Sequence, residues 1–137
     1  MSPNPVVPAG GRLAVGVDLV EVGRFRDLLA RRPGVATRLF VPEELAYAAR
    51  FGDPAPHLAA RFAAKEAFIK LLGAGLGAVS WHEVHVERAP TGQPLLSVSG
   101  RAAELASERG LSSWSLSLTH TSLIAAAVVA GMGDGGQ

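Results

Sequence analysis

The chain has 137 residues, enough for one domain with a hydrophobic core of its own. The chain has no cysteine, which excludes disulfides, thiolate zinc sites and a cysteine nucleophile. Its net charge is only +1, so no overall basic excess points to nucleic acid. Charged residues make up 18%, against a usual share of about a quarter, so we expect a partner, most simply a second copy, to cover some apolar surface.

Both ends are rich in proline or glycine. We expect residues 1–11 and 131–137 to be disordered, which leaves a single domain over residues 12–130. The N-terminus lacks the features of a signal peptide, and the apolar run 123–130 is far shorter than the roughly 20 residues of a membrane helix. We therefore expect a cytoplasmic protein that binds neither membrane nor nucleic acid.

Residues 13–19 alternate between two faces, with Leu13, Val15, Val17 and Leu19 on one of them, which predicts a strand. Asp18 falls on the other face, close to the expected end of the strand. Aspartate is unfavourable inside a strand, which suggests a functional task. The alternative is that Asp18 caps the next helix.

The apolar spacing then changes to that of a helix, which we expect to stop at Pro33 and Gly34. Its exposed side places Arg24, Leu28 and Arg31 at positions i, i+4 and i+7. This face is either simply solvated or a docking surface for an acidic, partly apolar partner helix.

A short helix follows from Pro42 to about residue 50, and a long helix runs from His57 to the glycine-rich exit 73–77. The long helix is apolar on most sides, so we expect it to be buried. The neighbours of Glu66 on this helix are mostly small or apolar, so its carboxylate needs a compensating cation. Either Glu66 forms an ordinary pair with Lys70, or it belongs to a functional site.

In the second half, segments 81–87 and 95–99 flank a proline- and glycine-containing turn and predict a hairpin. A helix over 101–109, an alternating strand over 114–120 and a continuous apolar strand over 123–130 complete the chain. The last strand should be central in its sheet. The order β-α-α-α-β-β-α-β-β predicts an α+β domain with helices packed on a mainly antiparallel sheet.

Asp18 and Glu66 are the candidates for chemistry. Two carboxylates without a cluster of metal-spaced histidines suit Mg²⁺, which binds one or two carboxylates together with substrate phosphates. Lys70, one turn beyond Glu66, would supply a positive charge for phosphate oxygens. Such a set suits a phosphoryl-type transfer. The sequence has no Walker loop and no nucleophile elbow.

Three segments in order resemble the motifs of the 4′-phosphopantetheinyl transferases, and in particular the short subtype, holo-acyl-carrier-protein synthase. They are Gly16-Val-Asp18-Leu-Val-Glu21-Val, Arg61-Phe-Ala-Ala-Lys65-Glu66-Ala-Phe-Ile-Lys70-Leu-Leu-Gly73 and Ser117-Leu-Thr-His120. The resemblance covers about residues 13–130. Thr119 stands where the family usually has serine, and it keeps the hydroxyl group. Ala74 stands where the family commonly has threonine; it lacks the hydroxyl group, which puts one side-chain contact to phosphate in doubt.

This resemblance implies the fold of that family and transfer of the phosphopantetheine arm of coenzyme A to a serine of an acidic acyl carrier protein, as in fatty acid biosynthesis. Adenosine 3′,5′-bisphosphate would be released. Asp18 and Glu66 would bind Mg²⁺, and with Lys70 they would form the catalytic set. Either Glu66 or a metal-bound water would deprotonate the serine.

The resemblance also implies binding roles. Coenzyme A would be contacted by Arg61, Lys65, Lys70, Gly73, Ser117 and His120. The carrier would dock on Arg24, Leu28 and Arg31. Short members of the family are similar in forming homotrimers with sites between subunits. An alternative function is a non-catalytic, ferredoxin-like oligomeric module that binds a small anion, in which His120 is only a hydrogen-bonded residue at a strand end.

Overall fold

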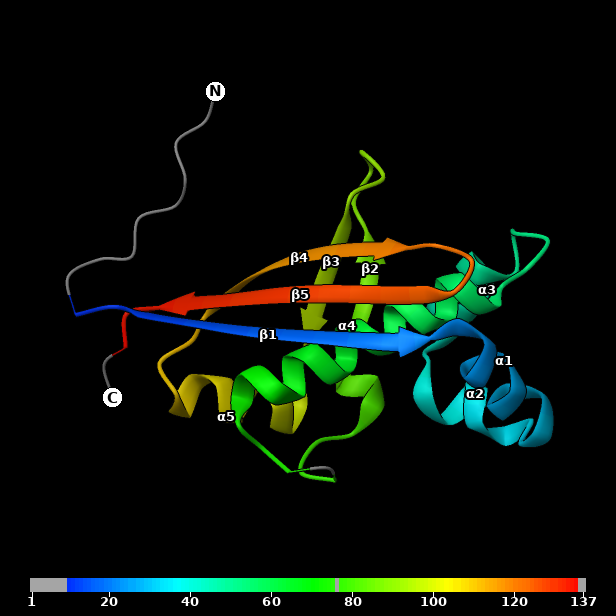
Figure 1. Cartoon of the computed structure of the whole chain (residues 1–137). Coiled ribbons are helices and arrows are strands. Elements are labelled where there is room, and N and C mark those ends of the chain that lie inside the picture. The colour runs from blue at the N-terminus through cyan, green and yellow to red at the C-terminus, as the bar shows by residue number, and fades with distance from the viewer. Residues whose placement is uncertain (1–9, 76, 136–137) are drawn as a thin grey trace.

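A computed structural model describes residues 10–75 and 77–135 of the chain (Figure 1). In chain order, the elements are β1 (Arg12–Glu21), α1 (Val22–Arg31), α2 (Gly34–Leu39), α3 (Pro42–Ala48), α4 (Ala55–Leu72), the 3-10 turn η1 (Trp81–Glu83), β2 (Val84–Arg88), β3 (Pro94–Val98), α5 (Gly100–Glu108), β4 (Ser113–His120) and β5 (Ile124–Gly133). The predicted α+β class is confirmed.

Helix α2 was not predicted, because the sequence analysis treats Pro33 and Gly34 as a stop. Proline ends a helix that arrives from its N-terminal side, but its fixed φ also suits the start of a new one. Pro33 has φ −56°, and the six-residue helix α2 begins directly after it. Among the described residues, four α-helices and the turn η1 therefore lie between β1 and β2, where three helices were predicted.

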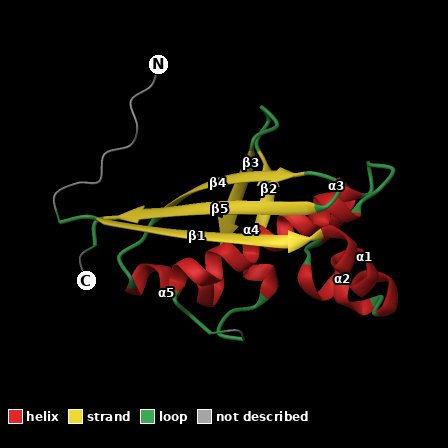
Figure 2. Cartoon of the chain, viewed as in Figure 1, coloured by secondary structure: helices red, strands yellow, loops and turns green. Residues whose placement is uncertain are grey.

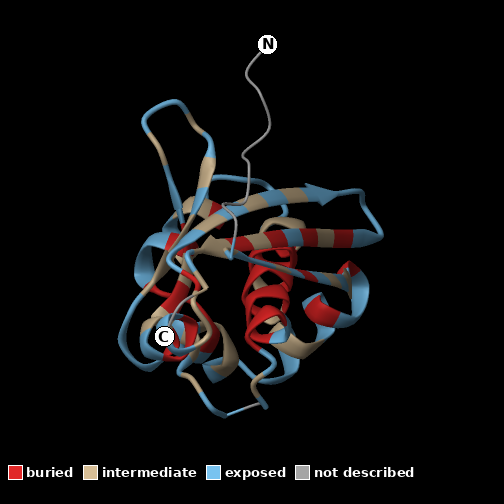
Figure 3. Cartoon of the chain, turned by 90° about the vertical axis from the view of Figure 1, so that its left-hand side faces the viewer, coloured by how far each residue is buried: buried red, intermediate tan, exposed pale blue. Residues whose placement is uncertain are grey.

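The strands form two antiparallel sheets (Figure 2). One sheet has the order β1-β5-β4, and β2 and β3 form a separate hairpin. The prediction that the apolar strand near the C-terminus is central is confirmed, since β5 pairs on both sides. Helix α4 packs across one face of the three-stranded sheet, where most of its residues are buried (Figure 3).

Two clusters of buried side chains share α4. The first half of α4 packs with α1, α2 and α3 around Phe25, Phe40 and Leu58. The second half packs with the sheet, the hairpin and α5 around Phe68, Val86 and other apolar residues. Helix α4 is thus the common centre of the core, and the side chains along it are held on several sides.

Strand β1 crosses α4 at Gly16, where the two backbones nearly touch. A Cβ at this position would lie 2.8 Å from the carbonyl carbon of Ala67, closer still to its oxygen, and 3.1 Å from the nitrogen of Leu71. Only glycine fits such an approach without moving the strand or the helix. Because Asp18 follows Gly16 by two residues and Glu66 precedes Ala67, this crossing also sets the distance between the two carboxyl groups.

No described element covers the other face of the sheet. Leu13, Val15, Val17 and Leu19 of β1 point away from α4 and are 54–68% exposed. The strand register continues this surface through Ile124 and Val128 of β5 and the hydroxyl groups of Ser113, Ser115, Ser117 and Thr119 of β4; we call these ten residues the outer sheet face. Contiguous apolar patches of this kind on a small chain mark an interaction surface.

The C-terminal boundary differs from the expectation. Strand β5 continues to Gly133 and pairs with β1 up to Arg12, so the expected disorder of 131–137 is wrong for residues 131–133. Glycine is required at Gly133 because a Cβ there would lie 2.8 Å from the carbonyl carbon of Gly110. Residues 1–9 and 136–137 lie outside the described part of the chain. Within that part, no helix combines the length and apolar character needed to cross a membrane.

Candidate functional site

Asp18 and Glu66 line one cavity of about 710 Å³, although they lie on different elements. Asp18 is on the face of β1 that packs on α4, and Glu66 is on α4 itself. Asp18 lies three residues before the end of β1, not at its end as expected, because pairing of Glu21 with Ile124 extends the strand. The Asp18 side chain is only 13% exposed.

Lys70 reaches across from α4 to β1. Its Nζ donates to Oδ1 of Asp18 at 2.8 Å and to the carbonyl oxygen of Val17 at 3.2 Å. The ordinary intrahelical pair of Lys70 with Glu66 is therefore not what the structure shows. The Lys70 side chain is 56% exposed, so its pair with Asp18 is screened by water and contributes little to stability.

The carboxylate of Asp18 disfavours ionisation of Glu66. Burial, and then the negative charge of Asp18, raise the pKa of Glu66, and Lys70 opposes this only in part. The hydrogen bond and the attraction to Asp18 raise the pKa of Lys70. A divalent cation between the carboxylates would relieve their repulsion.

The donor set fits Mg²⁺. Across residues 10–75 and 77–135, no group of three or more histidine, aspartate or glutamate side chains could hold a metal ion. A cation bound by Asp18 and Glu66 alone would take its other ligands from water or from a substrate. Mg²⁺ is bound in this way by one or two carboxylates and phosphate oxygens.

The predicted docking residues open onto the same cavity. Arg24, Leu28 and Arg31 of α1 line it together with Asp18 and Glu66. Arg24 is strongly exposed, with its side chain 83% accessible, and its guanidinium is 3.9 Å from Glu21. A partner that binds this basic and apolar face would therefore reach the two carboxylates.

A second, smaller cavity of about 190 Å³ lies beside the N-terminal part of α4. Its polar and aromatic lining residues are Tyr47, His57, Arg61, Arg88 and His120, which we call the cationic pocket. The guanidinium carbons of Arg61 and Arg88 lie 4.1 and 4.6 Å from the centre of the Tyr47 ring. The His57 ring packs edge-on to His120, with centroids 4.9 Å apart.

Two of these side chains are held in an unusual state. Arg61 is 4% exposed, and among the described residues its Nε has no hydrogen-bond partner. Burial, followed by the charges of His120 and Arg61, lowers the pKa of His57. A buried guanidinium with an unused donor, next to a second guanidinium, is suited to binding an anion.

Lys65 is a correction to the sequence analysis. It was expected to contact coenzyme A, but its side chain is fully buried and its Nζ bonds Glu44 at 2.8 Å. The same Nζ donates to the carbonyl oxygens of Trp81 and Val84 at 3.2 and 2.6 Å. All three ammonium hydrogens are used inside the protein, so Lys65 has none left for a ligand.

The remaining predicted residues are spread over the chain. Ser117 lies on the outer sheet face opposite Val128, away from both cavities. Gly73 ends α4 in the left-handed conformation at φ 67°. One chain therefore does not bring Ser117 to the cationic pocket that holds Arg61 and His120.

Tyr47, His57 and Arg88 of the cationic pocket were not among the predicted site residues. They come from α3, α4 and β2, and no regular spacing links them. The only available signal was the occurrence of aromatic and basic side chains in segments flanking the long helix.

The chain is similar to known proteins in sequence and in structure. The family model of the 4′-phosphopantetheinyl transferase superfamily matches residues 14–129. The holo-[acyl-carrier-protein] synthase of Salinispora arenicola is 51% identical over 119 residues, which cover 85% of this chain and 95% of the relative. That of Moorella thermoacetica is 41% identical over 116 residues, covering 85% and 91%.

Solved structures agree with this. The crystal structure of holo-[acyl-carrier-protein] synthase from Neisseria meningitidis has a TM-score of 0.76 at 33% identity, covering 86% of this chain and 96% of that one. The ACPS–CoA complex from Chronobacterium ammoniagenes has a TM-score of 0.79 at 28% identity, covering 89% and 98%.

Proposed function

This chain belongs to the 4′-phosphopantetheinyl transferase superfamily, and we propose that it is a holo-[acyl-carrier-protein] synthase that moves the 4′-phosphopantetheine arm of coenzyme A to a serine of apo acyl carrier protein. The observation that carries the proposal is that Asp18, Glu66 and the basic face of α1 meet at one cavity. A carboxylate pair beside a protein-docking face is what a transfer to a carrier requires.

In the reaction, the serine Oγ forms a bond to the β-phosphorus of coenzyme A. The bond from this phosphorus to the oxygen that bridges the two phosphates breaks, and adenosine 3′,5′-bisphosphate leaves with that oxygen. The serine proton passes to a base in the cavity. Glu66 is the candidate that the chain itself provides, because burial and the charge of Asp18 raise its pKa.

Asp18 and Glu66 would hold Mg²⁺, which when bound supplies positive charge at the pyrophosphate and polarises the phosphorus that is attacked. Lys70 Nζ, which donates a hydrogen bond to Asp18 Oδ1, adds a positive charge for the phosphate oxygens. Asp18 would thus hold both Lys70 and the cation beside the pyrophosphate.

The cationic pocket would bind the phosphate at the adenylate end of coenzyme A. Its volume of about 190 Å³ is below the roughly 300–1,000 Å³ of pockets that enclose a drug-sized ligand, but it accepts a phosphate group. Arg61 and Arg88 supply the fork-shaped donors that suit phosphate, and His120 lies beside them. The rest of coenzyme A then needs further surface.

A neighbouring subunit would provide that surface. The outer sheet face presents Leu13, Val15, Val17 and Leu19 to solvent in a single chain, which favours association of identical subunits into a closed ring. Within this proposal the assembly is a homotrimer, with sites at the subunit boundaries. Ser117, on the same face, would then approach a site across a boundary.

The carrier would dock on Arg24, Leu28 and Arg31, since two guanidinium groups around a leucine complement an acidic and apolar helix. This arrangement directs the carrier serine to the cavity of Asp18 and Glu66. A cytoplasmic location is part of this proposal, because its two substrates are coenzyme A and acyl carrier protein.

Intact-mass spectrometry of the carrier tests the proposal. Apo carrier mixed with this protein, coenzyme A and Mg²⁺ should gain one phosphopantetheinyl group, and a carrier with its acceptor serine replaced by alanine should gain none. The anion-binding module predicts no gain with either carrier. An unmodified wild-type carrier after prolonged incubation would reject the transferase function.

A further inference from the structure

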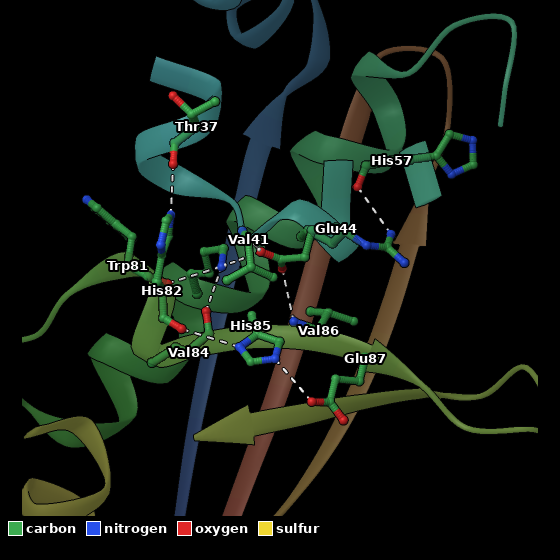
Figure 4. Close-up of polar contacts among 12 residues, drawn as sticks. Thr37, Val41, Glu44, His57, Trp81, His82, Val84, His85, Val86 and Glu87 are labelled. Carbon is green, nitrogen blue, oxygen red and sulfur yellow. Dashed lines mark hydrogen bonds and ion pairs between the residues drawn. The ribbon is translucent and has the colours of Figure 1, made fainter. Parts of the chain in front are cut away.

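A buried ion pair lies outside both cavities. The side chains of Glu44 on α3 and Lys65 on α4 are 0% exposed and are joined at 2.8 Å. Glu44 Oε1 also accepts from the backbone nitrogen of Val41 at 3.0 Å, and Oε2 accepts from that of Val86 at 3.0 Å (Figure 4). With the bonds from Lys65 to Trp81 and Val84, every strong hydrogen-bonding group of the pair is engaged.

The pair connects three elements, and each of them carries one wall of the cationic pocket. Tyr47 follows Glu44 by three residues on α3 and so lies one turn further along that helix. Arg61 precedes Lys65 by four residues on α4. Arg88 follows Val86 by two residues on β2 and shares its face.

The contacts within the pocket depend on this spacing. The guanidinium groups of Arg61 and Arg88 both pack over the Tyr47 ring, which belongs to α3. A shift of α3 or β2 against α4 would separate them. The Glu44 carboxylate, itself on α3, bonds at the same time to Lys65 of α4, to Val86 of β2 and to Val41, the residue before α3.

Stability alone does not explain such a pair. Burying two charges carries a large desolvation penalty, and apolar residues of similar volume often stabilise a core as well or better. What apolar residues lack is a set of directional bonds that fixes the elements in one arrangement.

We propose that Glu44 and Lys65 are positioning residues for the cationic pocket, and that they hold Tyr47, Arg61 and Arg88 at the spacing that binds the phosphate at the adenylate end of coenzyme A. This inference rests on the proposed function. Neither residue touches the substrate, and neither lines the cavity of Asp18 and Glu66.

The test replaces both members of the pair, because Lys65→Met alone would leave a buried carboxylate without its cation. The double variant Glu44→Leu/Lys65→Met keeps the core filled. We expect its KM for coenzyme A to rise about tenfold, with kcat and the KM for the carrier changed by less than about threefold. The preference for coenzyme A over 3′-dephospho-coenzyme A should fall by about the same tenfold factor.

Two controls separate positioning from folding. Arg101→Met/Glu104→Leu removes the exposed ion pairs of Arg101 with Glu104 and Glu108 on α5, at 3.6 and 3.2 Å, and should leave all kinetic constants unchanged. Glu44→Gln keeps an acceptor for Lys65 and should show a smaller change in the same direction. A purely structural pair would lower the melting temperature of either Glu44 variant and leave the KM for coenzyme A and the 3′-phosphate preference of the folded protein as in the wild type. That result would overturn the inference.

Calorimetric titration with adenosine 3′,5′-bisphosphate examines the pocket without turnover. Weaker binding by the double variant or by Glu44→Gln supports the positioning role, and equal binding contradicts it. If the wild type binds this nucleotide but transfers nothing to the carrier, the proposed function fails while the positioning role is still measured.

Discussion

Replacing Gly16 by alanine tests how the β1–α4 crossing sets the site. The added Cβ would press on the backbone of Ala67 and approach the nitrogen of Leu71 at 3.1 Å, and backbone cannot rotate away as a side chain can. Strand and helix must then separate by roughly 1 Å, and a misplacement of that size costs about 100-fold in rate. Overpacking of this kind also lowers the free energy of unfolding by about 1–3 kcal/mol.

The assay is initial-rate transfer to apo carrier, with the fraction of folded protein measured by circular dichroism at the same temperature. We expect Gly16→Ala to melt several degrees lower, since about 1 kcal/mol shifts the melting temperature by roughly 2–8 °C for domains near this size. The rate per folded molecule should fall about 100-fold, with a higher Mg²⁺ requirement. Both losses follow from the same displacement.

Gly23→Ala is the matched control. Gly23 is an exposed residue of α1, and a Cβ there meets nothing within 4 Å, so alanine should stabilise the helix by up to about 1 kcal/mol and leave transfer intact. A Gly16→Ala variant with wild-type rate and Mg²⁺ dependence would show that the crossing does not control the carboxylate geometry.

Three further outcomes are expected. Reversing charge with Arg24→Glu and Arg31→Glu should raise the KM for the carrier about tenfold or more and flatten its salt dependence; unchanged values would make the α1 face merely solvated. Val15→Lys should give a monomer by light scattering and lose transfer, whereas Leu95→Lys, on the exposed side of β3, should keep both; an assembled and active Val15→Lys would exclude the outer sheet face as the interface. Burial and nearby charges hold the pKa of His57 below its usual value near 6.5, so the unfolded chain binds more protons and stability should fall as pH drops below about 6.5. His57→Gln should flatten this slope in urea titrations, and an unaltered slope would refute the cause.

The sequence predicted those features of the fold and the site that depend on a local pattern of residues. Alternation over 13–19 predicted β1, the continuous apolar run predicted the central strand β5, and carboxylates at Asp18 and Glu66 stood out because they interrupt apolar surroundings. These are local patterns, and the structure places both carboxylates on one cavity.

Other features depend on contacts between distant residues. The sequence around Lys65 does not distinguish it from a ligand-binding lysine. Only the fold shows that its ammonium group forms an ion pair with Glu44, 21 residues earlier. The alternation predicted that Leu13 and Val15 share a face, but it did not predict that no described segment packs on this face. The glycines at the end of β5 suggested disorder. The structural reason for glycine at Gly133 is the close backbone of Gly110, a contact between distant residues that the local sequence does not reveal.

The claim most central to this account is that Asp18 and Glu66 share one divalent cation. Electron paramagnetic resonance with Mn²⁺ in place of Mg²⁺ measures it directly, with adenosine 3′,5′-bisphosphate present. Wild-type protein should bind one Mn²⁺ per site, and Asp18→Asn and Glu66→Gln should each weaken binding about tenfold or more while the protein stays folded. Wild-type Mn²⁺ affinity in either folded variant would contradict a shared site.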